Sequence, residues 1–319
     1  MQPAELPPNG ELHTFVELRQ RAREIGPRRV GVVLADDEVA LAAMADALKS
    51  GIAFPVLIGD EKSTRAKAES LGLHELAAKA EFVSVRDGAA ARAVKMAREG
   101  SIDILMKGHL RTDQLLRPVL DKEHGLRNGG LLSDVAFFES SLTGAAKLVG
   151  LTDGGLNVAP TLEQKKQIIL NAIEMLHCLG NHRPKIAVMS AIEVVSEAVP
   201  STVDAKALTE MGLAGEFGEA EVFGPLALDN ALLHSAARAK GIKSAVAGNA
   251  DCLVVPSVEA GNLLAKAISV LAGLEFGHVV VGAKVPILIP SRVEDAQTKV
   301  NTIAMGVLYA SCSGASRRT

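Results

Sequence analysis

The chain contains very few aromatic side chains and very few cysteines. Aromatic residues make up 3% of its 319 residues, with no tryptophan, whereas apolar residues of all kinds make up 48%. The core must therefore consist mainly of Ala, Val, Leu and Ile, which is typical of layered α/β proteins. The three cysteines, an odd number at scattered spacing, fit a reducing compartment and give no zinc site.

Several functional signatures are also absent from the sequence. No apolar run approaches the length of a membrane span, and the Pro-rich start MQPAELPPNG has no signal-peptide core. A net charge of −3 gives no electrostatic footprint for nucleic acid or an anionic membrane. The common nucleotide-binding and metal motifs are missing, and the eight histidines are scattered. We therefore expect a cytoplasmic protein with no nucleic-acid partner, no membrane partner and no metal.

Short apolar runs alternate with helical patterns along the chain. We expect strands at residues 29–35, 54–59, 82–85, 102–106, 133–138, 146–151, 184–189 and 279–281. We expect helices, among others, at 162–179 and 204–211, with one more running from the 224–231 motif through Lys240. Strands separated by helices of this length predict βαβ units and a mainly parallel sheet.

The stretch from residue 282 to 306 contains the strongest candidate site. Residues 285–289 predict a buried strand, which Pro290 ends because it has no N–H for the ladder. Ser291 and Arg292 then precede a helical pattern, so a hydroxyl, a guanidinium and free backbone N–H groups come together. Such a junction is a site for an anion, most naturally a phosphate. The alternative is that Ser291 only caps the helix and Arg292 is a solvated charge.

Other candidate residues follow expected strands or lie in glycine-rich turns. Lys107 follows the strand at 102–106 and Arg117 lies on the next helix, and ligands of parallel sheets collect beyond strand carboxyl ends. Arg127 lies in a glycine-flanked turn. Asn157 belongs to a loop whose two glycines bring the backbone close to whatever it faces.

Five motifs in this order resemble the phosphate acetyl/butyryltransferase family. They are KG-x-x-x-T (107–112), TDGG-x-N-x-AP (152–160), GPLA-x-DNA (224–231), AD-x-L-x-VP-x-x-EAGN (250–262) and PSR-x-x-D (290–295). The resemblance extends from about residue 100 to residue 310, and its detail is closer to the butyryl type than to the acetyl type. Members move an acyl group between coenzyme A (CoA) and phosphate.

The resemblance implies a two-domain isocitrate/isopropylmalate dehydrogenase-like α/β fold, with mainly parallel sheets and a cleft between the domains. Domain I would comprise residues 1–140 and 284–319, and domain II residues 141–283. The protein would be a homodimer or a larger homo-oligomer. CoA would be a substrate, and no cofactor would be needed.

The resemblance also assigns roles to individual residues. Ser291 would contact the CoA thiol, and Arg292 would hold the phosphoryl group, which a planar guanidinium fits better than an ammonium does. Asp295 is the nearest candidate for the base, although it is closer to the Arg than in the acetyl-type pattern. It could instead complement the helix dipole. The implied contacts to CoA or phosphate are Lys107, Thr112, Arg117, Arg127, Asn157, Asp251 and Lys284.

Two other functions are compatible with the sequence. One is an NAD(P)-dependent, metal-assisted hydroxy-acid dehydrogenase on the same fold, although no cluster of metal-binding residues is evident. The other is a non-catalytic acyl-CoA-binding protein, against which the intact Ser291 and Arg292 argue.

Overall fold

The computed structural model describes residues 10–142, 144–291 and 294–316, which divide into two compact units. Within these ranges, unit 1 contains residues 10–17 and 131–276, and unit 2 contains residues 18–130 and 277–316. The domain boundaries implied by the resemblance, at 140/141 and 283/284, stay a prediction, because compactness alone does not identify independently folding domains.

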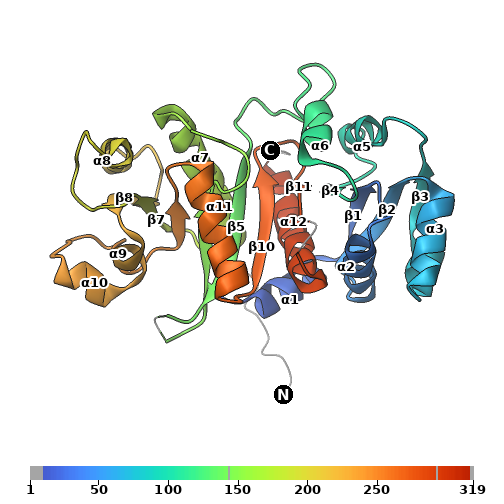
Figure 1. Cartoon of the computed structure of the whole chain (residues 1–319), viewed down its shortest axis with the longest axis horizontal. Coiled ribbons are helices and arrows are strands. Elements are labelled where there is room, and N and C mark those ends of the chain that lie inside the picture. The colour runs from blue at the N-terminus through green and yellow to red at the C-terminus, as the bar shows by residue number, and fades with distance from the viewer. Residues whose placement is uncertain (1–9, 143, 292–293, 317–319) are drawn as a thin grey trace. The chain divides into compact units, whose positions relative to one another are not determined.

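The strands of unit 2 follow one another in the order β3-β2-β1-β4-β11-β10 (Figure 1). All neighbouring pairs from β3 to β11 are parallel, and β10 is antiparallel to β11. Their bounds are β1 Arg28–Val33, β2 Ala53–Gly59, β3 Glu81–Ser84, β4 Ile104–Lys107, β10 Phe276–Val281 and β11 Ile287–Leu288.

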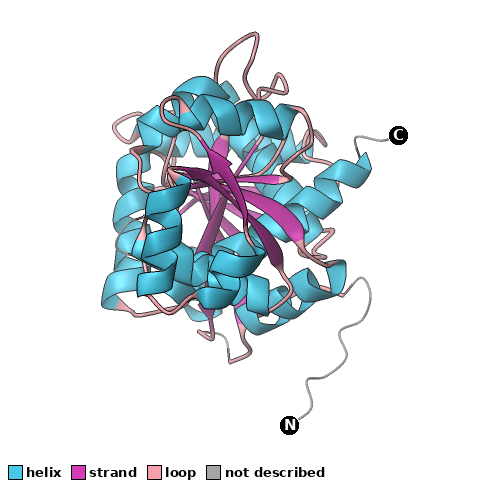
Figure 2. Ribbon diagram, turned by 90° about the vertical axis from the view of Figure 1, so that its right-hand side faces the viewer, coloured by secondary structure: helices cyan, strands magenta, loops and turns pink. Residues whose placement is uncertain are grey.

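Helices cover both faces of these strands (Figure 2). Helix α2 packs against α12, and α5 packs against α6. Their bounds are α1 Phe15–Ile25, α2 Glu38–Lys49, α3 Glu61–Ser70, α4 His74–Lys79, α5 Ala89–Arg98, α6 Thr112–Val119 and α12 Ala296–Ser316. Helix α12 is buried along most of its length, since even Asn301 and Thr302 have no exposed surface. It is therefore a central element of the unit 2 core.

The strands of unit 1 follow the order β5-β6-β9-β7-β8. Strands β6, β9, β7 and β8 run parallel to one another, and β5 is antiparallel to β6. The strand bounds are β5 Ser133–Ser140, β6 Lys147–Thr152, β7 Lys185–Met189, β8 Glu221–Leu226 and β9 Cys252–Val254. The helix bounds are α7 Leu162–Cys178, α8 Pro200–Leu213, α9 Leu228–Leu232, α10 His234–Ala239 and α11 Val258–Lys266, which continues as the π-helical turn η1 Ala267–Leu271.

The predicted class, an α/β protein with mainly parallel strands, is confirmed. One local prediction was wrong: residues 224–240 do not form a single helix, because Gly224 and Pro225 belong to strand β8 and two short helices follow. A Gly-Pro pair is typical of a turn and rare in a strand interior, so the local sequence does not indicate a strand here.

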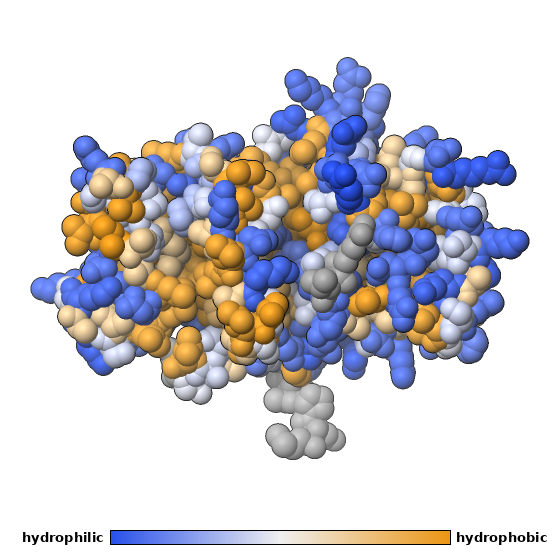
Figure 3. All heavy atoms as spheres, in the orientation of Figure 1, coloured by the Kyte–Doolittle hydropathy of each residue, from blue (hydrophilic) through white to orange (hydrophobic). Residues whose placement is uncertain are grey.

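Two further properties concern the described residues as a whole. None of the helices in these ranges combines the length and apolar character needed to cross a membrane. The same ranges contain no group of three or more His, Cys, Asp or Glu residues able to hold a metal ion. The apolar surface visible in Figure 3 includes α11 and η1, where Leu263, Val270 and Leu271 are each more than two-thirds exposed.

Candidate active site

The carboxyl ends of β1, β4 and β11 lie at the same edge of the unit 2 sheet, because these strands are parallel neighbours. Lys107 ends β4 and is 6% exposed. The next two main-chain N–H groups, of Gly108 and His109, donate to the carbonyls of Val33 and Leu34 at 3.0 and 2.7 Å. A Cβ at position 108 would lie 2.3 Å from the Leu34 carbonyl oxygen, so this contact requires glycine.

The turn that follows β11 contains Ser291, which is partly buried and lies at the same edge as Lys107. Arg292 lies outside the described residues. Asp295 provides the N-terminal cap of α12, since its Oδ1 accepts the Thr298 N–H at 2.7 Å. The cap of α12 is thus Asp295. The structure does not support the alternative interpretation, in which Ser291 was the cap.

A buried lysine holds this turn from within the helix. Lys299 is 2% exposed, and its Nζ donates to the carbonyls of Ser291 and Glu294 at 3.2 and 2.7 Å. Burial lowers the pKa of the Lys299 ammonium below its usual 10.5, and nearby carboxylates, first that of Glu294, partly oppose this shift. The Glu294 Oε2 also lies 3.6 Å from Nε2 of the buried His278 on β10.

Sequence reasoning identified neither Lys299 nor His278. The available signal was the position of Lys299, which directly precedes Val300. The apolar pattern of the expected helix predicts that Val300 faces the interior. Contacts such as those of His278 and Glu294 depend on residues far apart in the chain, so no local pattern predicts them.

The remaining candidates of unit 2 lie in two places. Thr112 is the first residue of α6, partly buried, and Arg117 is exposed in the last turn of that helix. Arg127 and Lys284 are both exposed and come together through backbone pairing, with Arg127 opposite Ala283 and the Lys284 N–H donating to Leu126 at 2.8 Å. Lys284 precedes β11 and Ser291 follows it, so they lie at opposite ends of that strand.

In unit 1, the loop after β6 is organised by a buried carboxylate. Asp153 is 3% exposed and accepts the main-chain N–H groups of Gly155, Leu156 and Asn157 at 2.8, 3.0 and 3.2 Å. Burial, and next the Asp134 carboxylate, raise the pKa of Asp153 above its usual value. The Asn157 amide donates to Asp153 and to the Leu132 carbonyl. Its amide hydrogens thus hold the loop, and its expected contact with substrate stays a prediction.

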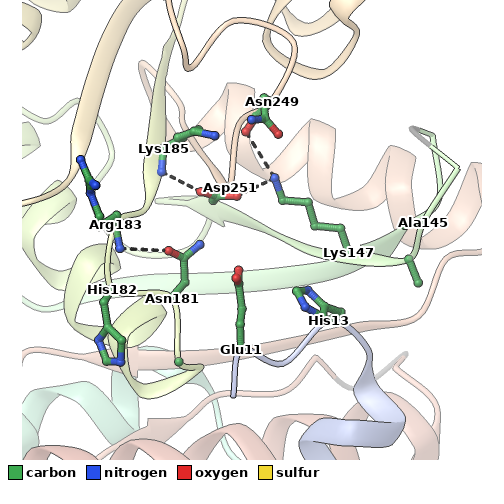
Figure 4. Close-up of a pocket in the computed structure, with 12 residues that line it drawn as sticks. Glu11, His13, Ala145, Lys147, Asn181, His182, Arg183, Lys185, Asn249 and Asp251 are labelled. Atoms are coloured by element: carbon green, nitrogen blue, oxygen red, sulfur yellow. Dashed lines mark hydrogen bonds and ion pairs between the residues drawn. The ribbon is translucent and has the colours of Figure 1, made fainter. Parts of the chain in front are cut away.

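Asp251 lies at the other end of the same strands, because it precedes β9, whereas Asn157 follows the parallel β6. It borders an open cavity of about 600 Å³ (Figure 4). Its Oδ1 lies 2.5 Å from the Lys147 Nζ, and its Oδ2 accepts the Lys185 N–H at 2.7 Å. Both carboxylate oxygens are engaged by the protein, and the implied role of Asp251 in substrate binding stays a prediction.

Comparison with known proteins decides the family. A family model described as phosphate acetyl/butaryl transferase matches residues 78–307, a range that contains all five motifs. The chain belongs to the phosphate acetyl/butyryltransferase family. The predicted family and the predicted enzyme class, an acyltransferase, are thereby confirmed.

Phosphate butyryltransferases and phosphate acetyltransferases are both similar to this chain. A phosphate butyryltransferase of Clostridium beijerinckii is 37% identical over 298 residues, which are 93% of this chain and 97% of that protein. A phosphate acetyltransferase of Rhizobium meliloti is 39% identical over 277 residues, 86% of each chain. The two sequence identities are nearly equal, so they do not distinguish the butyryl from the acetyl type.

Solved structures agree with this assignment. A branched-chain phosphotransacylase from Enterococcus faecalis V583 has a TM-score of 0.78 and 32% identity, with 89% of this chain and 99% of that chain covered. A phosphotransacetylase from Streptococcus pyogenes has a TM-score of 0.77 at 20% identity, covers 93% and 99% of the two chains, and shows the shared fold.

Proposed function

We propose that this protein transfers a short acyl group, acetyl or butyryl, between CoA and phosphate. The observation that carries the proposal is the family match across all five motifs, from KG-x-x-x-T to PSR-x-x-D. The position of Ser291 supports it, because Ser291 and Lys107 leave paired parallel strands at the edge where ligands of such sheets bind.

In the proposed reaction the CoA thiolate attacks the carbonyl carbon of an acyl phosphate directly. A carbon–sulfur bond forms, the carbon–oxygen bond to phosphate breaks, and the thiol proton passes to a base. A free thiol has a pKa of about 8.5 and is mostly protonated at neutral pH, so the enzyme must favour the thiolate. Charge that develops on the carbonyl oxygen and on the leaving phosphate requires a cation or directed N–H groups.

The proposed roles follow the family pattern. Ser291 hydrogen-bonds the thiol, and Arg292 holds the phosphoryl group with its planar guanidinium. Asp295 accepts the proton: one of its oxygens caps α12, and the carboxylate is exposed enough to meet a substrate. Lys107, Thr112, Arg117, Arg127, Asn157, Asp251 and Lys284 are the proposed contacts to CoA or phosphate.

A direct assay tests this function against its alternatives. The purified protein is incubated with phosphate and a panel of acyl-CoA esters, from acetyl to branched-chain and hexanoyl, and thiol release is followed. We expect phosphate-dependent release, fastest with acetyl-CoA or butyryl-CoA, that survives dialysis against EDTA. Binding of acyl-CoA without release would support the non-catalytic alternative. Reduction of NAD(P) by hydroxy acids would support the dehydrogenase.

We further propose that the protein works as a homodimer in the cytoplasm. The family resemblance implies the homodimer, and the exposed apolar residues Leu263, Val270 and Leu271 offer a surface for a second copy. Light scattering coupled to size-exclusion chromatography should give twice the chain mass, and Leu271→Asp should shift it towards the monomer. A monomeric wild-type mass would contradict this proposal.

A further inference from the structure

Lys299 forms an unusual contact with the turn that contains Ser291. Its ammonium donates to two main-chain carbonyls, of Ser291 at 3.2 Å and of Glu294 at 2.7 Å. These two residues flank Arg292 and Val293 in the sequence. A single side chain from the first turn of α12 therefore binds the backbone at Ser291 and again at Glu294.

This contact is costly for the folded protein, which argues for a functional reason. Lys299 is 2% exposed, and moving an ammonium out of water is unfavourable unless its charge is well compensated. Among the described residues, its hydrogen-bond acceptors are carbonyl oxygens, whereas carboxylates act on it only electrostatically. Charge-assisted hydrogen bonds of this kind are strong and directional, so they fix the position of the carbonyls.

Two further contacts hold the same turn. The Glu294 carboxylate lies 3.6 Å from His278 on β10, and the Asp295 carboxylate accepts the Thr298 N–H. The turn is thus anchored to the sheet by one residue and to the helix by two. The Ser291 carbonyl accepts the Glu294 main-chain N–H at 3.3 Å, and among these three side chains Lys299 is the one that donates to it.

We infer that Lys299 is a positioning residue for acyl transfer, which fixes Ser291 relative to the substrates by binding the carbonyls of Ser291 and Glu294. The inference rests on the proposed function. A small misplacement of reacting groups lowers turnover strongly, whereas a purely structural lysine would affect stability alone. The ammonium acts through the backbone and does not itself touch the substrate.

Unit 1 offers a matched control for this role. Lys165 on α7 is also buried, at 6% exposure, and its Nζ donates to Asp204 at 2.7 Å. Neither Lys165 nor Asp204 belongs to the proposed site. Lys299→Met and Lys165→Met each keep the length of the side chain and remove one buried ammonium.

The experiment compares kcat, the KM values of both substrates and hydrogen exchange in the wild type and the two variants. Lys299→Met should lower kcat about 10–100-fold, with smaller changes in KM, while Lys165→Met stays within about twofold of the wild type. Exchange in the peptide covering residues 290–298 should become about tenfold faster in Lys299→Met only. Lys299→Arg, which keeps a cationic donor, should recover part of kcat.

The outcomes separate this inference from the proposed function. Wild-type exchange at 290–298 together with wild-type kcat in folded Lys299→Met would overturn the inference. If the wild-type protein itself transfers no acyl group, the proposed function fails, and the exchange data still decide whether Lys299 fixes the turn. If Lys299→Met does not fold, the same comparison is made with Lys299→Arg, for which unchanged kcat and tenfold faster exchange would also contradict the role.

Discussion

The Asp295 carboxylate accepts the main-chain N–H of Thr298 at 2.7 Å, which makes Asp295 the cap of the helix that follows the Ser-Arg pair. The same carboxylate is the proposed base. One group can serve both purposes, because a cap uses one oxygen as an acceptor and leaves the other for a proton.

Replacing Asp295 by Asn separates these two roles. Asn caps helices about as well as Asp does but cannot take a proton, so we expect Asp295→Asn to fold normally and to lose about 10²-fold in kcat. Asp60→Asn is the control, because Asp60 caps α3 through the Ser63 N–H and lies outside the site. Ordinary kinetics in Asp295→Asn would leave Asp295 with the capping role only.

Arg292 should be essential for turnover. If its guanidinium holds the phosphoryl group and the developing charge, Arg292→Ala should lower kcat by about 10²–10³, the loss typical of one oxyanion donor. Arg292→Lys should recover little, because a point charge cannot replace a planar fork. Arg238→Ala, at an exposed position on α10, provides the control. Turnover close to normal in Arg292→Ala would mean that the phosphate binds elsewhere.

Asp153 should give the stability of the protein a specific pH dependence. Burial, and next Asp134, raise the pKa of Asp153 in the folded state above its usual 3.8, so the folded chain binds this proton more tightly than the unfolded chain. The contribution of Asp153 is therefore greatest at acidic pH and is lost as the pH rises from 3.8 through the folded pKa.

The prediction is checked by denaturant unfolding of the wild type and Asp153→Asn at several values between about pH 4 and pH 8. The free energy of unfolding of the wild type minus that of the variant should fall as the pH rises above 3.8 and should then level off. A difference that rises with pH would mean that the folded protein favours the charged carboxylate.

The acyl group should pass directly from CoA to phosphate without an acyl-enzyme. Cys252 has no exposed surface, and burial, with Asp251 second, strongly raises the pKa of its thiol, so it cannot supply a thiolate nucleophile. Cys252→Ala should keep substantial turnover, and initial rates with both substrates varied should give intersecting lines. Parallel lines, or exchange between acyl-CoA and CoA without phosphate, would establish a covalent route.

Local patterns predicted much of the fold because the core consists of aliphatic runs. Strands β1, β2 and β4 and helix α7 match the predicted positions to within a few residues, and Asp37 caps α2 as its place before an apolar helix indicates. Strand β8 was missed because its backbone accommodates Gly224 and Pro225. That accommodation depends on neighbouring elements, which the local sequence does not specify.

The candidate site was predictable only in part. A strand ended by Pro290 and followed by a helix identified the Ser291 turn, since this signal lies in consecutive residues. The contacts of Lys299 and His278 depend on how α12 and β10 pack, and so they appear only in the structure. The sequence did indicate at which end of β9 Asp251 lies, because Asp251 comes directly before the apolar residues of that strand.

The burial of α12 has a consequence for the order in which the protein can fold during synthesis. Unit 2 needs β11 and α12, which are translated more than 150 residues after β4, the strand that β11 pairs with. Most of unit 1 is one continuous segment that leaves the ribosome earlier. We therefore expect the middle of the chain to be able to fold first, while β4 and α2 lack their contacts with α12 and depend on chaperones until that helix is made.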